Sequence, residues 1–369
     1  MSEERKMILK MLKDGKISED EALKLLDAIG QNDEKVYEGN TTNSFAESTQ
    51  NLANKIVSGV DKILKKTGEK LNSIDIAYDF DIDLGDSRNY SFSRFKSKTN
   101  KRKVIEVKDL ESPNLLVNNT NGKIKVDTWD MDYIEVNASV TFNEKYVNES
   151  YDFVEDYVNG DNVEIRVAHH NSKKQPFNVD LDIYVPKKRY GNVDVRSTNG
   201  LVDVSFVESN VFHGENVNGK LEVKKVIANE VKLESVNGKV LAQEVETTNL
   251  DIDCVNGKIE FFDNLAKDIS VNNVNGPIVG GMISEITGKL SIESVNAGIE
   301  LNNLNFERPI RLETGRLAEY TTRLELSEKF ANVRKENRKT EATSASYSDM
   351  AENKLEIFIS TVNGRIKVQ

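Results

Sequence analysis

Few residues of this chain have the types and spacing that catalysis or metal binding requires. The histidines are His169, His170 and His213, and none has a cysteine or histidine at a metal-ligand spacing. Cys254 is the only cysteine and stands where the other repeats carry Ser or Asn, which gives no case for a catalytic thiol. The sequence has no Gly-x-Ser-x-Gly, phosphate-binding loop or dinucleotide fingerprint. We therefore predict no catalytic residue, no metal site and no cofactor.

Charged residues recur instead at regular places in a repeat. Acidic residues stand three before the repeated asparagine, at Glu215, Glu234, Asp253 and Glu293. Lysines stand two after it, at Lys220, Lys239 and Lys258. A solvated strand face explains this pattern, and an ordered charged stripe that reads a glycan or polyanion is the functional alternative. Some parallel β-helices cleave polysaccharides with clustered carboxylates, so a polysaccharide-active enzyme is one alternative function.

The elements that position these side chains follow from an Asn-Gly repeat. Five asparagines, each followed by glycine, are spaced nineteen residues apart: Asn199, Asn218, Asn237, Asn256 and Asn275. A fixed period near twenty is typical of a stacked solenoid. We expect these asparagines to form a structural ladder, because stacked Asn side chains bond to each other and the following Gly accepts a positive φ.

Apolar columns keep the same register as the asparagine. β-Branched and other apolar residues recur six, four and one positions before it and three and five after it, as in Leu250, Ile252, Val255, Ile259 and Phe261. A spacing of two indicates strands, and stacking at about 4.8 Å would bury the columns between coils. We predict a mainly β fold, a parallel β-helix or β-solenoid of about nineteen-residue coils over residues 101–369. A Greek-key sandwich is the rival fold.

Residues 1–30 indicate a small helical hairpin. A Ser-x-x-Glu capping box at Ser18 begins its second helix. Its apolar residues are Ile8, Met11 and Leu12 in the first helix and Leu25, Leu26 and Ile29 in the second. A hairpin of this size cannot stand on its own core, so we expect it to dock on a protein partner, a second copy of the chain or the end of the solenoid.

Residues 31–100 predict a linker, an amphipathic helix over 45–71 and a leading strand over 74–84. The helix has an apolar face of Leu52, Ile56, Val60, Ile63 and Leu64. Its candidate membrane-contact residues are Lys55, Lys62, Lys65 and Lys66. Lysine on the polar face is typical of an in-plane membrane helix, so an anionic membrane is one partner. A helix that caps the end of the solenoid is the alternative.

Composition limits the partners further. The formal net charge of -11 argues against nucleic acid as a partner. No apolar run approaches the length of a membrane-spanning helix, and the first residues do not resemble a signal peptide. We expect a cytoplasmic protein, with peripheral membrane attachment or non-standard export as alternatives.

Three segments resemble two known families. Residues 115–140 and the final Ser360–Val368 segment resemble the bacterial "putative adhesin" β-strand repeat domain of unknown function. The segment from Lys10 to Leu26 resembles the start of YvlB-like and LiaX-like proteins of Gram-positive bacteria. The chain departs from the repeat pattern at Asn296-Ala297, at Thr314-Gly315 and over the polar stretch 329–353, which we interpret as a loop or frayed rim.

The resemblance implies an association with cell-envelope stress and carries no catalytic residues. We therefore predict a non-enzymatic scaffold or sensor of the cell envelope that binds a protein partner or the membrane surface. A surface adhesin for glycan or protein is the second alternative function.

Overall fold

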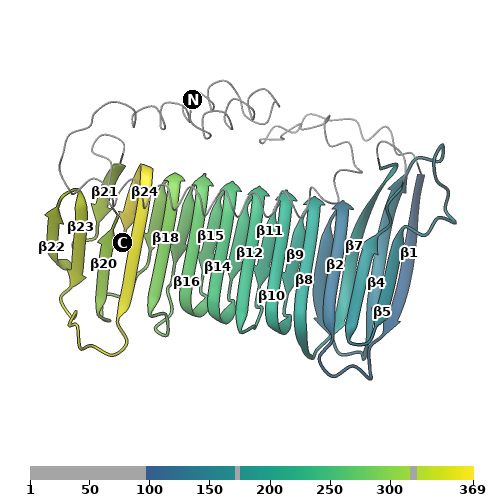
Figure 1. Cartoon of the computed structure of the whole chain (residues 1–369), viewed down its shortest axis with the longest axis horizontal. Helices are drawn as coiled ribbons and strands as arrows, with labels where there is room; N and C mark the ends of the chain where they lie inside the picture. The colour runs from purple at the N-terminus through teal and green to yellow at the C-terminus, as the bar shows by residue number, and fades with distance from the viewer. Residues whose placement is uncertain (1–96, 171–174, 316–321) are drawn as a thin grey trace, which may run out of the picture. The chain divides into compact units, whose positions relative to one another are not determined.

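The structure, a computed structural model, describes residues 97–170, 175–315 and 322–369, and these residues form a mainly β fold (Figure 1). The predicted hairpin 1–30, linker 31–44, helix 45–71 and strand 74–84 lie outside the described residues. The candidate docking residues and the candidate lysines named above therefore lie outside them too.

Each central coil contributes one long and one short strand. The long strands are β8 (Arg189–Asn199), β10 (Glu208–Asn218), β12 (Glu230–Asn237), β14 (Glu246–Asn256), β16 (Leu265–Asn275) and β18 (Lys289–Asn296). The short strands are β9 (Val202–Ser205), β11 (Leu221–Lys224), β13 (Val240–Gln243), β15 (Ile259–Phe262), β17 (Ile278–Gly281) and β19 (Ile299–Asn302). We call the two stacks the long-strand sheet and the short-strand sheet.

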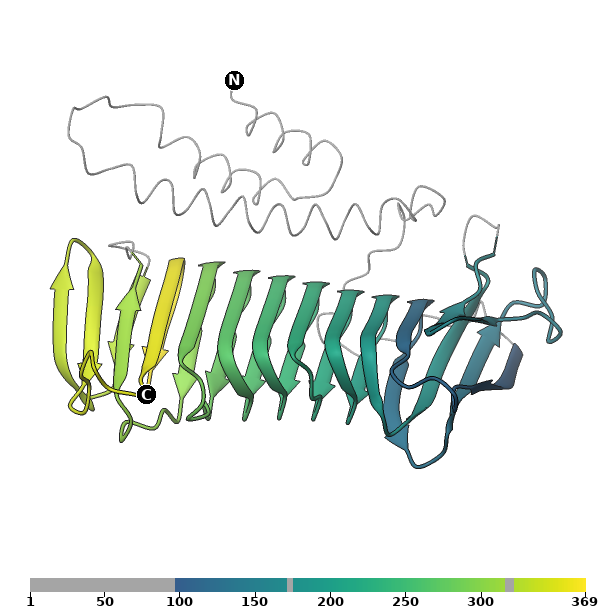
Figure 2. The same ribbon diagram turned by 60° about the horizontal axis from the view of Figure 1, so that its bottom comes forward.

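Strands of successive coils pair in parallel and in register. Asn218 pairs with Asn199 on one side and Asn237 on the other, one repeat away in each direction. Figure 2 shows the resulting regular stack. The predicted β-solenoid of nineteen-residue coils is confirmed, and the Greek-key alternative is wrong, because neighbouring repeats pair in parallel rather than antiparallel.

The stacking order departs from chain order at both ends. The coil of β2 (Asn114–Asn121) and β3 (Ile124–Trp129) lies between β6 (Asn162–Val167) with β7 (Phe177–Pro186) and the coil of β8 and β9. The last strand, β24 (Leu355–Val368), lies between the coil of β18 and β19 and the strands β20 (Ile310–Thr314) and β21 (Thr322–Leu326). The final segment is thus an inserted coil.

Antiparallel strands cover the two ends of the stack. At one end β4 (Tyr133–Phe142) pairs with β1 (Ser97–Glu106) and β7, and β5 (Val154–Asn159) pairs with β6. At the other end β23 (Lys339–Ser344) pairs with β20 and β22 (Phe330–Glu336). The interpretation of 329–353 as a loop is wrong, because its polar strands form a hairpin that shields the last parallel strand from edge-to-edge pairing.

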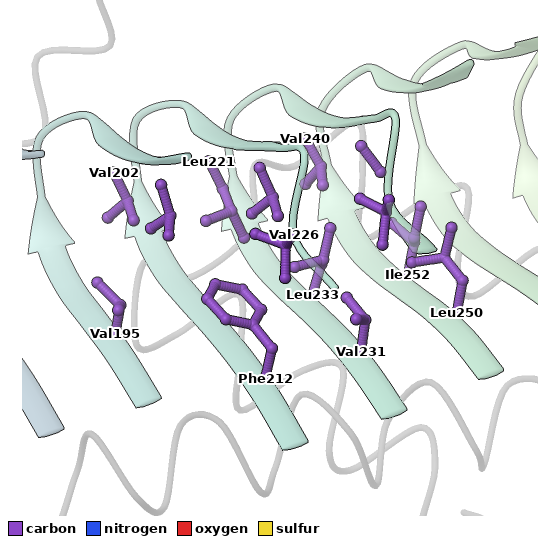
Figure 3. Packing of buried hydrophobic residues seen from close by; sticks show 14 of the residues in the cluster. Val195, Val202, Phe212, Leu221, Val226, Val231, Leu233, Val240, Leu250 and Ile252 are labelled. Atoms are coloured by element: carbon purple, nitrogen blue, oxygen red, sulfur yellow. The ribbon is translucent and has the colours of Figure 1, made fainter. Parts of the chain in front are cut away.

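The core is built from stacked columns between the two sheets. Figure 3 shows Val195, Phe212, Leu233 and Ile252 of the long strands packed among neighbours from adjacent coils. Large residues are matched by small ones in the next coil. A Cβ on Gly280, for example, would lie 2.2 Å from the Phe261 ring, so this glycine makes room for the aromatic side chain.

One predicted apolar column lies outside the core. The column directly before the asparagine is half-buried and faces outward on the long-strand sheet, because strand side chains alternate and the core columns occupy the other parity. A buried column that the prediction lacked, Val207, Val226 and Val245, fills the corner after the short strands. Before it, the chain turns at residues with positive φ that are not glycine, such as Phe206 and Lys225.

Candidate interaction face

The asparagine ladder is continuous along the long-strand sheet. Each asparagine except the first, Asn121, donates an Nδ2 hydrogen to the Oδ1 of the asparagine in the adjacent coil, at distances from 2.8 to 3.1 Å. The ladder includes Asn121, Asn199, Asn218, Asn237, Asn256, Asn275, Asn296 and Asn363. The five asparagines singled out from the sequence thus bond to one another, which is a structural arrangement.

Inside this ladder, small polar side chains hold the bend from the core side. Asn216 Nδ2 donates to the carbonyl oxygens of Gly200 and Lys220 at 2.8 and 3.0 Å. Cys254 occupies the same column, with Sγ 3.6 Å from the Gly238 oxygen. Desolvation raises the pKa of the Cys254 thiol to about 12, so it stays a protonated packing residue at neutral pH.

The outer surface of the long-strand sheet carries an apolar column next to charged ones. We call this surface the valine face. Its half-buried column consists of Val217, Val236, Val255, Val274, Val295 and Val362. The predicted acidic column lies beside it, two residues earlier in each strand. An apolar stripe flanked by charges on a regular surface is typical of an interaction site.

A network of charges links three coils at one end of the valine face. His213 lies 2.7 Å from Glu234 Oε2 through Nε2 and 3.4 Å from Asp194 Oδ1 through Nδ1. Lys232 Nζ lies 2.7 Å from Glu234 Oε1, and Arg196 Nε lies 2.7 Å from Asp194 Oδ1. His213, unassigned in the sequence analysis, is thereby a bridge between β8, β10 and β12.

Burial and ion pairing shift the pKa values of this network. Desolvation acts against charge on His213, but its hydrogen bonds to Asp194 and Glu234 prevail and raise its pKa to about 9. Desolvation of Glu234 is likewise outweighed by His213 and Lys232, which lower its pKa to about 2. Near neutral pH the network is ionised on both sides, which is how buried charges are tolerated.

Glu222, Glu260 and Glu300 of the short-strand sheet also form ion pairs. Glu260 pairs with Lys239 and Lys258, both from the predicted lysine column, and these pairs lower its pKa against the effect of desolvation. A polysaccharide-cleaving enzyme needs one carboxyl with a raised pKa as its general acid. Glu234 and Glu260 have the opposite property and act as ion-pair partners.

The histidines considered in the sequence analysis are not brought together into one site. His169 and His170 lie in the segment that follows β6, far along the chain from His213. Within the described ranges no group of three or more His, Cys, Asp or Glu residues could hold a metal ion. The residues that the structure describes also include no helix long and apolar enough to cross a membrane.

A shallow groove of about 500 Å³ lies at the corner near the start of the stack. Its lining includes Lys187, Lys188, Phe206 and Ile227. Lys187 pairs with Asp130 at 2.8 Å, and Lys188 donates to the Val107 and Leu110 carbonyls. Because both lysines already have partners in the protein, the groove is a weaker candidate than the valine face.

The repeat geometry agrees with comparisons to known families. Residues 114–369 match the Toastrack DUF4097 family. The chain belongs to the Toastrack DUF4097 family. Residues 3–34 match a SHOCT-like domain. The resemblance to the "putative adhesin" repeat domain is confirmed, whereas the link to YvlB-like and LiaX-like proteins stays a prediction. A search of curated proteins finds no match.

Three solved structures are similar to this chain at low sequence identity and low TM-score. A "putative cell adhesion protein" from Clostridium sporogenes is 13% identical, with a TM-score of 0.27, over 74% of this chain and 99% of its own. A "putative lipid binding protein" from Parabacteroides distasonis is 9% identical, with a TM-score of 0.37, over 73% and 97%. A "putative adhesin" from Parabacteroides merdae is 10% identical, with a TM-score of 0.25, over 56% and 93%.

Proposed function

We propose that this Toastrack protein is a non-enzymatic scaffold or sensor of the bacterial cell envelope. Its solenoid is the rigid part and presents the valine face as a binding surface. Its N-terminal third supplies the contacts to other components: the hairpin 1–30 docks a protein partner or a second copy, and helix 45–71 contacts anionic membrane. In this proposal the protein works from the cytoplasmic side as a peripheral membrane protein.

The observation that carries the proposal is the straight, outward-facing apolar column on six successive coils in space. A single exposed valine is ordinary, but a continuous column flanked by carboxylates is a ready surface for a long partner. The asparagine ladder and the in-register sheets hold the coils at a fixed step. A rigid regular surface can bind without paying much conformational entropy, as binding scaffolds require.

The membrane part is tested by flotation of the full chain with vesicles. Helix lysines near an anionic surface contribute about 1 kcal/mol each, so their loss should weaken binding strongly. We expect the wild type to float with anionic but not neutral vesicles and to be released by high salt. Neutralising the four candidate lysines should reduce flotation at least about tenfold: Lys55→Gln, Lys62→Gln, Lys65→Gln and Lys66→Gln.

A matched control removes the same number of charges from exposed sites on the solenoid. It carries Lys98→Gln, Lys267→Gln, Lys335→Gln and Lys339→Gln, all at exposed positions. The control should float like the wild type. If wild type does not float with anionic vesicles, or if both variants lose flotation equally, the membrane contact through helix 45–71 is refuted.

A further inference from the structure

Three aromatic side chains gather outside the core, where β3, β7 and β4 continue the short-strand sheet beyond β9. The ring centroids of Trp129 and Tyr184 are 5.5 Å apart at an interplanar angle of 30°, and those of Trp129 and Tyr133 are 4.9 Å apart at 79°. Ile183 and Val185, on either side of Tyr184, are buried in the core, so alternation turns Tyr184 outward. All three aromatic residues are half-buried. We call this group the aromatic platform.

The indole of Trp129 is held against the outer surface of the sheet. Its Nε1 donates to the backbone oxygen of Tyr133 at 2.9 Å. Because β7 lies between β3 and β4, the indole that makes this bond lies across β7. Tyr184 packs beside the indole and Tyr133 meets it edge-on, so the ring is fixed while its outer face is turned to solvent. A ring fixed in advance loses little side-chain entropy when a ligand binds.

The strands beneath the platform offer no free edge. β3 pairs with β7 and β9, β7 with β3 and β4, and β4 with β1 and β7. A peptide that binds as an added β-strand therefore has no backbone groups to pair with here. A ligand of the platform must instead be recognised by the ring faces and by the side chains around them.

The charged side chains around the platform are balanced. Three ion pairs connect neighbouring positions of the same sheet: Arg102–Glu135, Lys123–Asp182 at 3.3 Å and Lys125–Asp127 at 3.9 Å. Paired in this way, they give no net charge that would attract an ionic ligand. Each carboxylate still has capacity for further hydrogen bonds, because its two oxygens offer about four acceptor sites. These surroundings therefore suit a neutral ligand with many hydroxyl groups.

We propose that Trp129, Tyr133 and Tyr184 form a stacking platform for a neutral glycan, a chain of hexose or N-acetylhexosamine units. A sugar ring has a face of C–H groups and a rim of hydroxyls. The C–H groups meet the electron-rich faces of the aromatic rings. The hydroxyls exchange hydrogen bonds with the charged pairs around the platform. Water released from both apolar faces provides the driving force.

The shallow groove at the corner extends the platform. Asp127 lines the groove and also lies opposite Tyr184 in the register of β3 and β7. Phe206 is 54% exposed and lines the same groove, which adds a further aromatic ring. The lysines of the groove have partners in the protein, and this does not hinder a neutral ligand. Platform and groove together form an elongated site, so a chain of sugars should bind more tightly than a single sugar.

The test is a titration of the full-length protein followed by tryptophan fluorescence. Trp129 is the only tryptophan of the chain, so its emission reports on the platform alone. The neutral probes are cellotetraose, chitotetraose and maltotetraose, which differ in sugar unit and linkage. Choline chloride is the cationic probe, because aromatic rings also bind quaternary ammonium groups. We expect at least one oligosaccharide to change the emission in a saturable way, and choline to leave it unchanged.

Variants of the platform assign the binding to its rings. Tyr184→Ala should weaken oligosaccharide binding at least about tenfold, because a ring contact is lost. Tyr184→Phe keeps the ring and should bind within about threefold of the wild type. Tyr133→Ala tests the same platform from another strand if circular dichroism shows that Tyr184→Ala folds poorly. Tyr146→Ala is the control, since it removes an exposed tyrosine outside the platform and should bind like the wild type.

Three outcomes would overturn the proposal. They are an unchanged Trp129 emission with all three oligosaccharides, a response to choline alone, and equal binding by the platform variants and Tyr146→Ala. Glycan binding goes beyond the proposed function and does not depend on it, because the platform uses neither the valine face nor the lysines of helix 45–71. Vesicle flotation therefore tests the membrane contact separately.

Discussion

At the scale of single residues, the bend after an Asn-Gly asparagine such as Asn218 leaves no room for a side chain at the glycine. Gly219 has φ +125°, and a Cβ there would lie 2.2 Å from the oxygen of Gly200 in the next coil. The Asn-Gly pairs could be predicted from the sequence because the stacked asparagine and the side-chain-free residue after it are adjacent in the chain. The same pair also recurs at a step of nineteen residues. The αL residues at the second corner, such as Lys225 and Glu244, could not, since their types carry no turn signal.

This crowding predicts a large difference between two glycine substitutions. Gly219→Ala should lower the free energy of unfolding by about 2 kcal/mol or more, because it combines a strained φ with contact to a backbone oxygen. Gly288→Ala is the control, since a Cβ there meets nothing within 4 Å, and should change it by less than about 0.5 kcal/mol. Urea unfolding followed by circular dichroism measures both. Equal losses would contradict the steric account of the bend.

At the scale of elements, charge pairs tie neighbouring strands together. Asp194, His213 and Lys232 occupy one column at nineteen-residue steps, so the repeat alone could have placed them side by side. Sequence analysis missed this column because it treated His213 as an isolated residue. The sequence analysis also grouped the valine column with the buried apolar columns, although it faces outward. Alternation of side chains along the strand, rather than their hydrophobicity, decides which column faces the core.

The network predicts a defined dependence of stability on pH. His213 has a folded pKa of about 9, above its ordinary 6.5, so it stabilises the fold fully below pH 6.5 and loses this effect as pH rises through 9. Glu234 has a folded pKa of about 2, below its ordinary 4.5, so its contribution is present above pH 4.5 and lost as pH falls toward 2. Stability should therefore be greatest between these windows, near pH 5–6.5.

Substitution of His213 isolates the alkaline part of the dependence of stability on pH. Between pH 6 and 9.5 the wild type should lose roughly 1–3 kcal/mol of unfolding free energy from this group. His213→Gln should be less stable at pH 6 and show a flatter profile over the same range. Urea denaturation at several pH values provides the measurement, with His169→Gln as the matched control. An unchanged slope in His213→Gln would rule out the network as its source.

At the scale of the whole described solenoid, the sequence predicts the coil but not the order of the coils at the ends. Nearly equivalent repeats can stack on one another in many orders, and the period carries no information about which neighbours are chosen. The insertion of β24 between β18 and β20 depends on pairing across a long stretch of chain. It joins the terminal hairpin of β22 and β23 to the central coils, so the last residues fasten the end of the stack.

This arrangement predicts different unfolding behaviour for equivalent cavities. Ile252 and Ile359 occupy the same core column, are both fully buried, and lie in a central coil and in β24, respectively. Truncation of either isoleucine to alanine should lower the free energy of unfolding of the coil that contains it by roughly 2–5 kcal/mol. Because a solenoid is stabilised by contacts between nearest neighbours, the outcome should depend on where the weak coil lies.

Hydrogen–deuterium exchange distinguishes the two sites. In Ile359→Ala, faster exchange should be confined to the end of the stack, from β20 to β24 and the adjacent β18 and β19, since the coils up to β17 retain both of their neighbours. In Ile252→Ala, faster exchange should extend to both sides of β14, because a central interface is shared by two halves of the stack. If Ile359→Ala instead raises exchange evenly from β8 to β19, the coils unfold as one cooperative unit. In that case β24 would stabilise the central coils as well as the terminal hairpin. Its weakening would then unfold all the coils that carry the valine face.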